Sequence, residues 1–187
     1  MLERAHCEST GGVVHLRRER ELASGHWLLS AASAANRPQA KTEWKERGAA
    51  WLRPGVLFSA VEIPAGVLHA AVGLDDPRRC AGPLAEALEF GPLFYSSDGF
   101  QSEGSYTALV PARVARLPEP LPGVVTLHQR ALLLVPAPHV TEPVQGGGPW
   151  WVSPLGGPGL LCPPERVAAM AAFGWGALAA AKGRQDA

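Results

Sequence analysis

Carboxylate side chains are almost absent from the three most apolar segments of this 187-residue sequence. These segments are Val56–Ile63, Tyr106–Val110 and Ala131–Val135; a proline follows each, and Glu62 is the only acidic residue in any of them. Apolar, β-branched segments that end at a proline are typical of strands. Proteins hold divalent ions such as magnesium mainly through carboxylate oxygens. The segments therefore offer almost no carboxylate to a divalent ion.

Cysteine and histidine patterns also argue against a metal centre or a disulfide framework. The three cysteines, Cys7, Cys80 and Cys162, are widely separated and odd in number, which is typical of reduced thiols in a cytoplasmic protein. None of the six histidines lies four residues from another or in a His-Glu-x-x-His pattern, so a helical zinc site is not indicated. We therefore predict no metal and no other cofactor.

Long apolar runs and a net charge are missing as well. No uninterrupted run of about 18 apolar residues could span a membrane, and the first residues lack the order of a signal peptide. Basic and acidic residues both number 17, so no net field draws the chain to nucleic acid or to an anionic membrane. Only residues 1–53 are more basic than acidic, nine to six. We predict a cytoplasmic protein without a membrane partner, and weak contact of this basic third with single-stranded nucleic acid stays open.

The length and composition suit one globular domain, because 187 residues that are 47% hydrophobic and 18% charged can bury a sizeable core. Residues 1–14 have no clear periodicity and are predicted to be a flexible leader before a single domain of residues 15–187. Helices are predicted at 15–35 (one or two), 42–47, 65–74, 83–89 and 163–181, and strands at 56–63, 93–96, 105–110, 124–127 and 131–135. This order predicts an α+β fold with a mostly antiparallel central sheet flanked by helices.

The tripeptide His128-Gln129-Arg130 lies between two of these predicted strands, which we expect to pair with each other around it. Polar residues are common at hairpin tips, so an exposed turn is one interpretation. A functional role for His128, which is close to Arg130, is the other.

Tryptophans are the other candidates for function. Trp44 and Trp51, on either side of Gly48, are predicted to pack onto the body of the domain. Trp150 and Trp151 lie in an extended segment, where adjacent side chains face opposite ways. One of the two is therefore expected in the core, and the other is a candidate surface for a protein partner or for stacking on a base.

Three segments together resemble the N-terminal catalytic domain of bifunctional DNA primase/polymerases, in the archaeo-eukaryotic primase superfamily. The segments are Val61-Glu62-Ile63-Pro64, Gly104-Ser105-Tyr106 with the strand that follows, and Val125-Thr126-Leu127-His128 with Leu132–Pro138. More narrowly, the chain is similar to compact actinobacterial stand-alone proteins of this type, over about residues 27–167. The resemblance implies a primase/polymerase-like fold with its groove at Glu62, Tyr106, Thr126, His128 and Arg130.

The resemblance also implies that catalytic groups of that family are replaced here. Glu62 and Pro64 stand where the family has two aspartates, Tyr106 where it has a histidine, and Thr126 where it has a last aspartate. We therefore expect a catalytically inactive binding or adaptor module for a protein partner, or for a nucleotide or single-stranded nucleic acid in the groove. The alternative is an active enzyme on a nucleotide-like substrate that uses Glu62, His128 and Arg130, which requires Glu62 and His128 to meet in one pocket.

Overall fold

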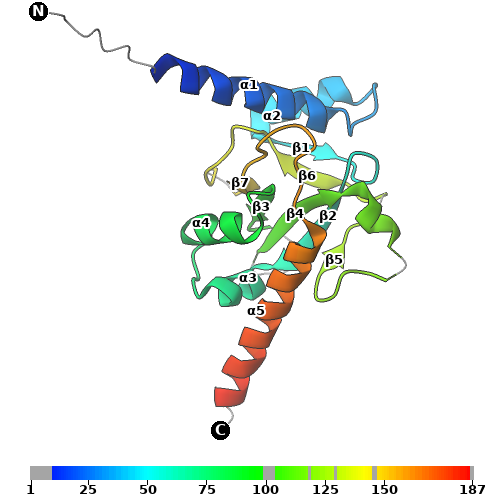
Figure 1. Ribbon diagram of the computed structural model, residues 1–187. Coiled ribbons are helices and arrows are strands. Elements are labelled where there is room, and N and C mark those ends of the chain that lie inside the picture. The colour runs from blue at the N-terminus through cyan, green and yellow to red at the C-terminus, as the bar shows by residue number, and fades with distance from the viewer. Residues whose placement is uncertain (1–9, 99–103, 118, 129, 145–146, 186–187) are drawn as a thin grey trace, which may run out of the picture.

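The computed structural model shows one α+β domain with a central antiparallel sheet and helices on both of its faces (Figure 1). It describes residues 10–98, 104–117, 119–128, 130–144 and 147–185. The predicted fold class is therefore confirmed. No helix in these residues is long and apolar enough to cross a membrane.

Groups of helices and groups of short strands follow one another along the chain. The helices are α1 (Thr10–Leu29), α2 (Arg37–Arg47), α3 (Ala65–Val72), α4 (Pro77–Ala87), the 3₁₀ helix η1 (Ala112–Arg116) and α5 (Pro164–Gln185). The strands are β1 (Ala49–Leu52), β2 (Phe58–Pro64), β3 (Leu93–Ser96), β4 (Ser105–Pro111), β5 (Val125–Thr126), β6 (Leu133–Pro136) and β7 (Trp150–Ser153).

The main sheet has the strand order β5-β2-β4-β3-β7, and every neighbouring pair is antiparallel. Its centre is the seven-residue pairing of β2 with β4, from Phe58 opposite Pro111 to Pro64 opposite Ser105. Each of these strands ends at its proline, and a helix begins at the next residue. Proline suits such an end because it has no N–H to continue the ladder.

Alternation along the strands divides the core into two layers. We call the face covered by α1, α2 and the β1–β6 pair the α1 face, and the face covered by α3, α4 and α5 the α5 face (Figure 1). In β2, Phe58 and Ala60 are buried on the α1 face, whereas Val61 and Ile63 are buried on the α5 face. A residue's position in a strand therefore decides which layer it can contact.

The predicted pairing of residues 124–127 with 131–135 is wrong. β5 pairs with β2 at the edge of the main sheet, whereas β6 pairs with β1 in a separate two-stranded sheet. We did not predict β1. It begins directly after Gly48, whose φ of 72° and N–H bond to the Trp44 carbonyl end α2, as predicted, and reverse the chain.

Strand β1 also explains a second error. Trp44 is buried as predicted, but Trp51 is 50% exposed. In β1, Ala50 and Leu52 face the core, so alternation turns Trp51 outward.

Three helices begin five or six residues earlier than predicted. Helix α2 begins at Arg37 rather than Thr42, with a proline in its first turn. Helix α1 already begins at Thr10, so the leader boundary at residue 14 falls inside it, and residues 1–9 lie outside the described residues. Helix α4 begins at Pro77 rather than Pro83, because Asp76 caps it by accepting a 2.9 Å hydrogen bond from the Arg79 N–H. Pro83 therefore lies within the helix.

Helix α5 packs along α3 and continues past the edge of the sheet (Figure 1). In α5, Gly174 lies against the Val67 backbone of α3. A Cβ at position 174 would lie only 2.8 Å from the Val67 carbonyl carbon. Glycine at this position therefore allows the crossing.

Candidate functional site

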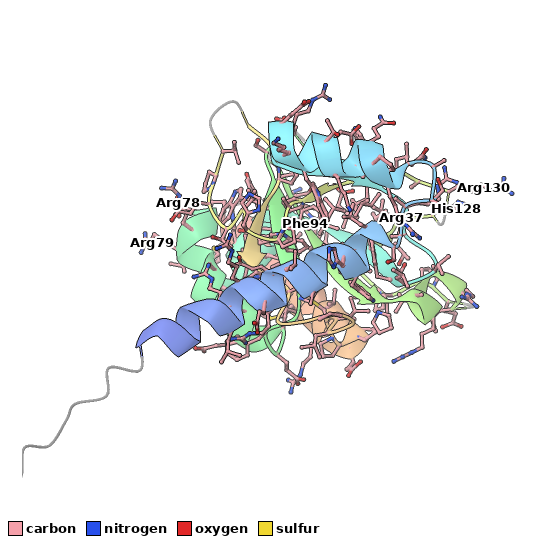
Figure 2. The ribbon with its side chains drawn as sticks, turned by 90° about the horizontal axis from the view of Figure 1, so that it is seen from above. Arg37, Arg78, Arg79, Phe94, His128 and Arg130 are labelled. Atoms are coloured by element: carbon pink, nitrogen blue, oxygen red, sulfur yellow. The ribbon has the colours of Figure 1, made fainter. Side chains whose placement is uncertain are left out.

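A cavity of about 560 Å³ lies beside β5, between the edge of the main sheet and η1. Figure 2 shows His128 and Arg130 together at one edge of the molecule, with Arg78 and Arg79 at the opposite edge. The walls combine apolar side chains with three hydrogen-bond donors: Val114, Ala115, Leu117, Pro120, Thr126, Leu127, His128 and Arg130. A volume of this size is typical of small-molecule sites.

Backbone hydrogen bonds position the residues that line the cavity. Pro111 ends β4, and η1 then turns the chain so that Val114 and Leu117, joined by a 3.2 Å N–H to carbonyl bond, both line the cavity. On the other side, the Leu127 N–H donates to the Ala60 carbonyl (2.8 Å) and extends β5 by one residue along β2. The chain leaves the sheet immediately afterwards, which positions His128 and Arg130 at the cavity.

The turn after β5 orients the His128 ring. The Ala131 N–H donates to the His128 carbonyl (2.8 Å), and the Arg130 N–H donates to His128 Nδ1 (3.1 Å). The second bond needs a lone pair on Nδ1, so the proton of the neutral ring is on Nε2. His128 therefore offers an Nε2–H donor to a ligand.

The Thr126 hydroxyl is the most informative atom of the cavity. Its oxygen is buried and has no hydrogen-bond partner in the described part of the chain. A buried polar group without a partner costs about 1–3 kcal/mol. Thr126 lines the cavity, so rotation of its side chain would bring this hydroxyl to a ligand atom, which would then supply the missing hydrogen bond.

The charge of the walls is positive. Arg130 is exposed, and its guanidinium carries a permanent charge. None of the lining residues that the structure describes is acidic. Thr126, His128 and Arg130 thus offer a hydroxyl, an imidazole N–H and a cation to one ligand, while Val114, Leu117 and Leu127 offer apolar contact. This combination suits an amphipathic anion.

Only three of the five residues expected to form a groove line this cavity; Glu62 and Tyr106 do not. Thr126 pairs with Val61, and Tyr106 pairs with Ile63, so both belong to the α5 face. Glu62 is the neighbour of Val61 in β2, and adjacent side chains in a strand point to opposite faces. The Glu62 side chain therefore lies on the α1 face. The alternative of an active enzyme requires Glu62 and His128 to line one pocket. Glu62 does not line the cavity that contains His128.

Tyr106 instead belongs to a buried polar cluster beneath α3. Its hydroxyl lies 3.0 Å from His69 Nε2, and its side chain is fully buried. Burial raises the pKa of Tyr106 above its ordinary value, and the nearby Cys80 thiol adds to the rise. Burial lowers the pKa of His69, against the opposing effect of Asp75 and Asp76. The cluster is part of the packed core rather than of the cavity.

The His69 shift predicts how stability depends on pH. Because its pKa is lower in the folded protein than in the unfolded chain (about 6.5), the unfolded chain takes up the proton first as pH falls. The contribution is therefore present above about pH 6.5 and is lost as pH falls through the folded-state pKa. Urea unfolding at pH 7 and pH 5 should show a smaller loss of stability for His69→Gln than for the wild type. Equal losses would contradict this assignment.

The prediction that one of the adjacent tryptophans is exposed is wrong. Trp150 is 5% exposed and Trp151 is 1% exposed, because β7 is covered on both faces. The Trp151 Nε1–H donates to the carbonyls of Pro136 (3.2 Å) and Ala137 (3.1 Å), and its ring meets Phe94 edge to face. Both side chains are therefore core residues rather than a partner surface.

Sequence reasoning missed the η1 wall of the cavity. We did not predict from the sequence that η1 lines one cavity with residues 126–128 and Arg130. The available signal was the three-residue spacing of Val114 and Leu117, which places both on one face of a 3₁₀ helix.

Among the described residues, no three His, Cys, Asp or Glu side chains are close enough together to hold a metal ion. Comparisons of the chain with protein-family models, with curated proteins and with solved structures found no match. The geometry of the cavity is therefore the main guide to function.

Proposed function

We propose that this protein is a binding module whose η1–β5 cavity takes a nucleotide-like anion without metal-dependent catalysis. The observation that carries the proposal is the unpartnered, buried Thr126 hydroxyl in the same walls as His128 and Arg130. A phosphate group accepts hydrogen bonds from all three, and a base or sugar packs on Val114 and Leu117.

The position of Glu62, the only acidic residue in the strands that the structure describes, supports a non-catalytic role. Metal-dependent nucleotidyl transfer needs carboxylates beside the phosphates, because the metal ions neutralise the charge that develops there. Glu62 lies on the face of the sheet opposite Thr126, one register step away, and it does not line the cavity. The cavity therefore offers a nucleotide donors and apolar contacts, and no carboxylate among its described lining residues.

Kinship with primase/polymerase domains is a separate proposal that the binding function does not require. The α+β class and the proline-ended strands β2 and β4 support it. The division of Glu62 and Thr126 between opposite faces counts against an inherited metal site at these positions.

The substitution Arg130→Gln tests the binding proposal. Isothermal titration should show that the wild type binds adenosine monophosphate at least tenfold more tightly than adenosine, because a charge-assisted hydrogen bond contributes about 1.5–3 kcal/mol. Arg130→Gln should remove most of this difference. A short single-stranded oligonucleotide, titrated in parallel, shows whether the cavity also accepts a phosphate within a chain.

Arg79→Gln is the matched control. Arg79 is also an exposed arginine, but it lies at the opposite edge of the molecule (Figure 2), and the change leaves its capping N–H in place. Its affinity for adenosine monophosphate should equal that of the wild type. Equal binding of the nucleotide and the nucleoside, or equal losses in both variants, would overturn the proposal.

A further inference from the structure

A second cavity of about 560 Å³ is lined by α1, α2 and the segment after β6. The two helices lie at one end of the molecule (Figure 1). We call this cavity the α1–α2 groove. Its walls are the facing sides of the two helices and the segment after β6: Arg18, Glu21, Leu22, Gly25, His26, Leu29, Lys41, Trp44, Lys45, Ala137, Pro138 and His139.

The floor of the groove is apolar. Trp44 and Leu29 are buried in the core layer of the α1 face, and Pro138 lies against α1. Gly25 adds no side chain at this point: a Cβ there would lie 3.4 Å from Pro138 Cγ and 3.8 Å from the Trp44 ring. Leu22, which is 62% exposed, extends the apolar surface along α1.

The edges of the groove are basic. Lys41 and Lys45 are four residues apart on one face of α2, and Arg18 faces them from α1. Glu21 is the only acid among the described lining residues, and its carboxylate already pairs with Arg17 (3.0 Å). Within the described chain, no ion pair engages Arg18, Lys41 or Lys45. Three cationic side chains that form no ion pair within the described chain thus lie around the apolar floor.

We propose that the α1–α2 groove docks an acidic, amphipathic segment of a protein partner. Apolar side chains of that segment pack on Trp44, Leu29 and Leu22, and its carboxylates meet Arg18, Lys41 and Lys45. Apolar burial supplies affinity, and complementary charge supplies orientation and a fast, salt-dependent encounter. The groove shares no residue with the η1–β5 cavity, so this proposal stands independently of nucleotide binding.

The test uses a fluorescein-labelled helical peptide of 16 residues, with leucines at i, i+3, i+4 and i+7 and glutamates at the flanking positions. Fluorescence anisotropy with the full chain should give saturable binding that weakens as salt rises. The double variant Lys41→Glu/Lys45→Glu should lose at least tenfold in affinity. The matched control is Arg20→Glu/Arg47→Glu, which makes the same charge change at exposed sites on the same two helices outside the groove, and it should lose less than threefold.

Several results would overturn the proposal. One is equal affinity for a peptide in which lysines replace the glutamates. Another is an equal loss in the two double variants, which would mean that net charge alone attracts the peptide. A third is the absence of saturable binding up to about 1 mM. Saturable binding of dodecanoate in the absence of any peptide binding would assign the groove to a small amphipathic carboxylate instead. Circular dichroism confirms that each variant is folded.

Discussion

Trp151→Ala should destabilise the protein by about 3–5 kcal/mol in urea unfolding, the range for removing a large aromatic side chain from a core. Trp151 is almost fully buried in the α1-face layer, where its ring packs against Phe94 at a centroid distance of 5.3 Å. Its Nε1–H also donates to two carbonyls at the end of β6, those of Pro136 and Ala137. The alanine variant would leave a cavity and lose both hydrogen bonds.

Two further tryptophan variants make this prediction specific. Trp51→Ala removes the same side chain from a half-exposed position and should change stability by less than about 1 kcal/mol. Trp151→Phe keeps an aromatic ring but removes the N–H, so its loss should be intermediate. Similar losses for Trp51→Ala and Trp151→Ala would show that β7 is not covered on both faces.

Gly174→Ala should cost about 3 kcal/mol, although alanine normally favours a helix over glycine by about 1 kcal/mol. The added methyl group would meet the Val67 carbonyl group and Cγ1, with the closest contact at the carbonyl oxygen. Because two of these three atoms are backbone, the helices α3 and α5 must move apart to accept it. Urea unfolding measures the loss directly.

Gly176→Ala is the control for this prediction. The two glycines are two residues apart in α5, but a Cβ at position 176 meets nothing within 4 Å. This variant should be more stable than the wild type by up to about 1 kcal/mol, since only helix propensity changes. A gain for both variants would mean that α5 does not pack against α3 at Gly174.

The fold class was predictable because strand and helix signals were local. The apolar strands β2 and β4 carry their own proline ends, and the last helix begins at a Pro-Pro-Glu start that needs no tertiary information. The choice of which strands pair with each other depends on residues far apart in the sequence. β6 pairs with β1, more than 80 residues earlier, and the four residues of β1 are too few to show a clear alternation. Sequence proximity therefore suggested the wrong partner for β6.

The candidate site was predictable only in part, for a related reason. Thr126, His128 and Arg130 share a cavity because they follow one another along a short segment. Glu62 and Tyr106 were predicted to lie in the same groove only because of the order of the three motifs along the sequence. That order does not determine which face of the sheet a side chain occupies. Val61 pairs with Thr126, so Glu62, the next residue in β2, lies on the opposite face from Thr126. A shift of one residue in the register would reverse this placement.

The central claim is that the η1–β5 cavity binds a nucleotide through Thr126, His128 and Arg130 without a metal ion. The most direct measurement is isothermal titration of the wild-type protein with adenosine monophosphate, once in EDTA and once in magnesium. The account predicts saturable binding at one site per chain, with the same Kd in both buffers. Binding that occurs only with magnesium, or no saturable binding in either buffer, would contradict it.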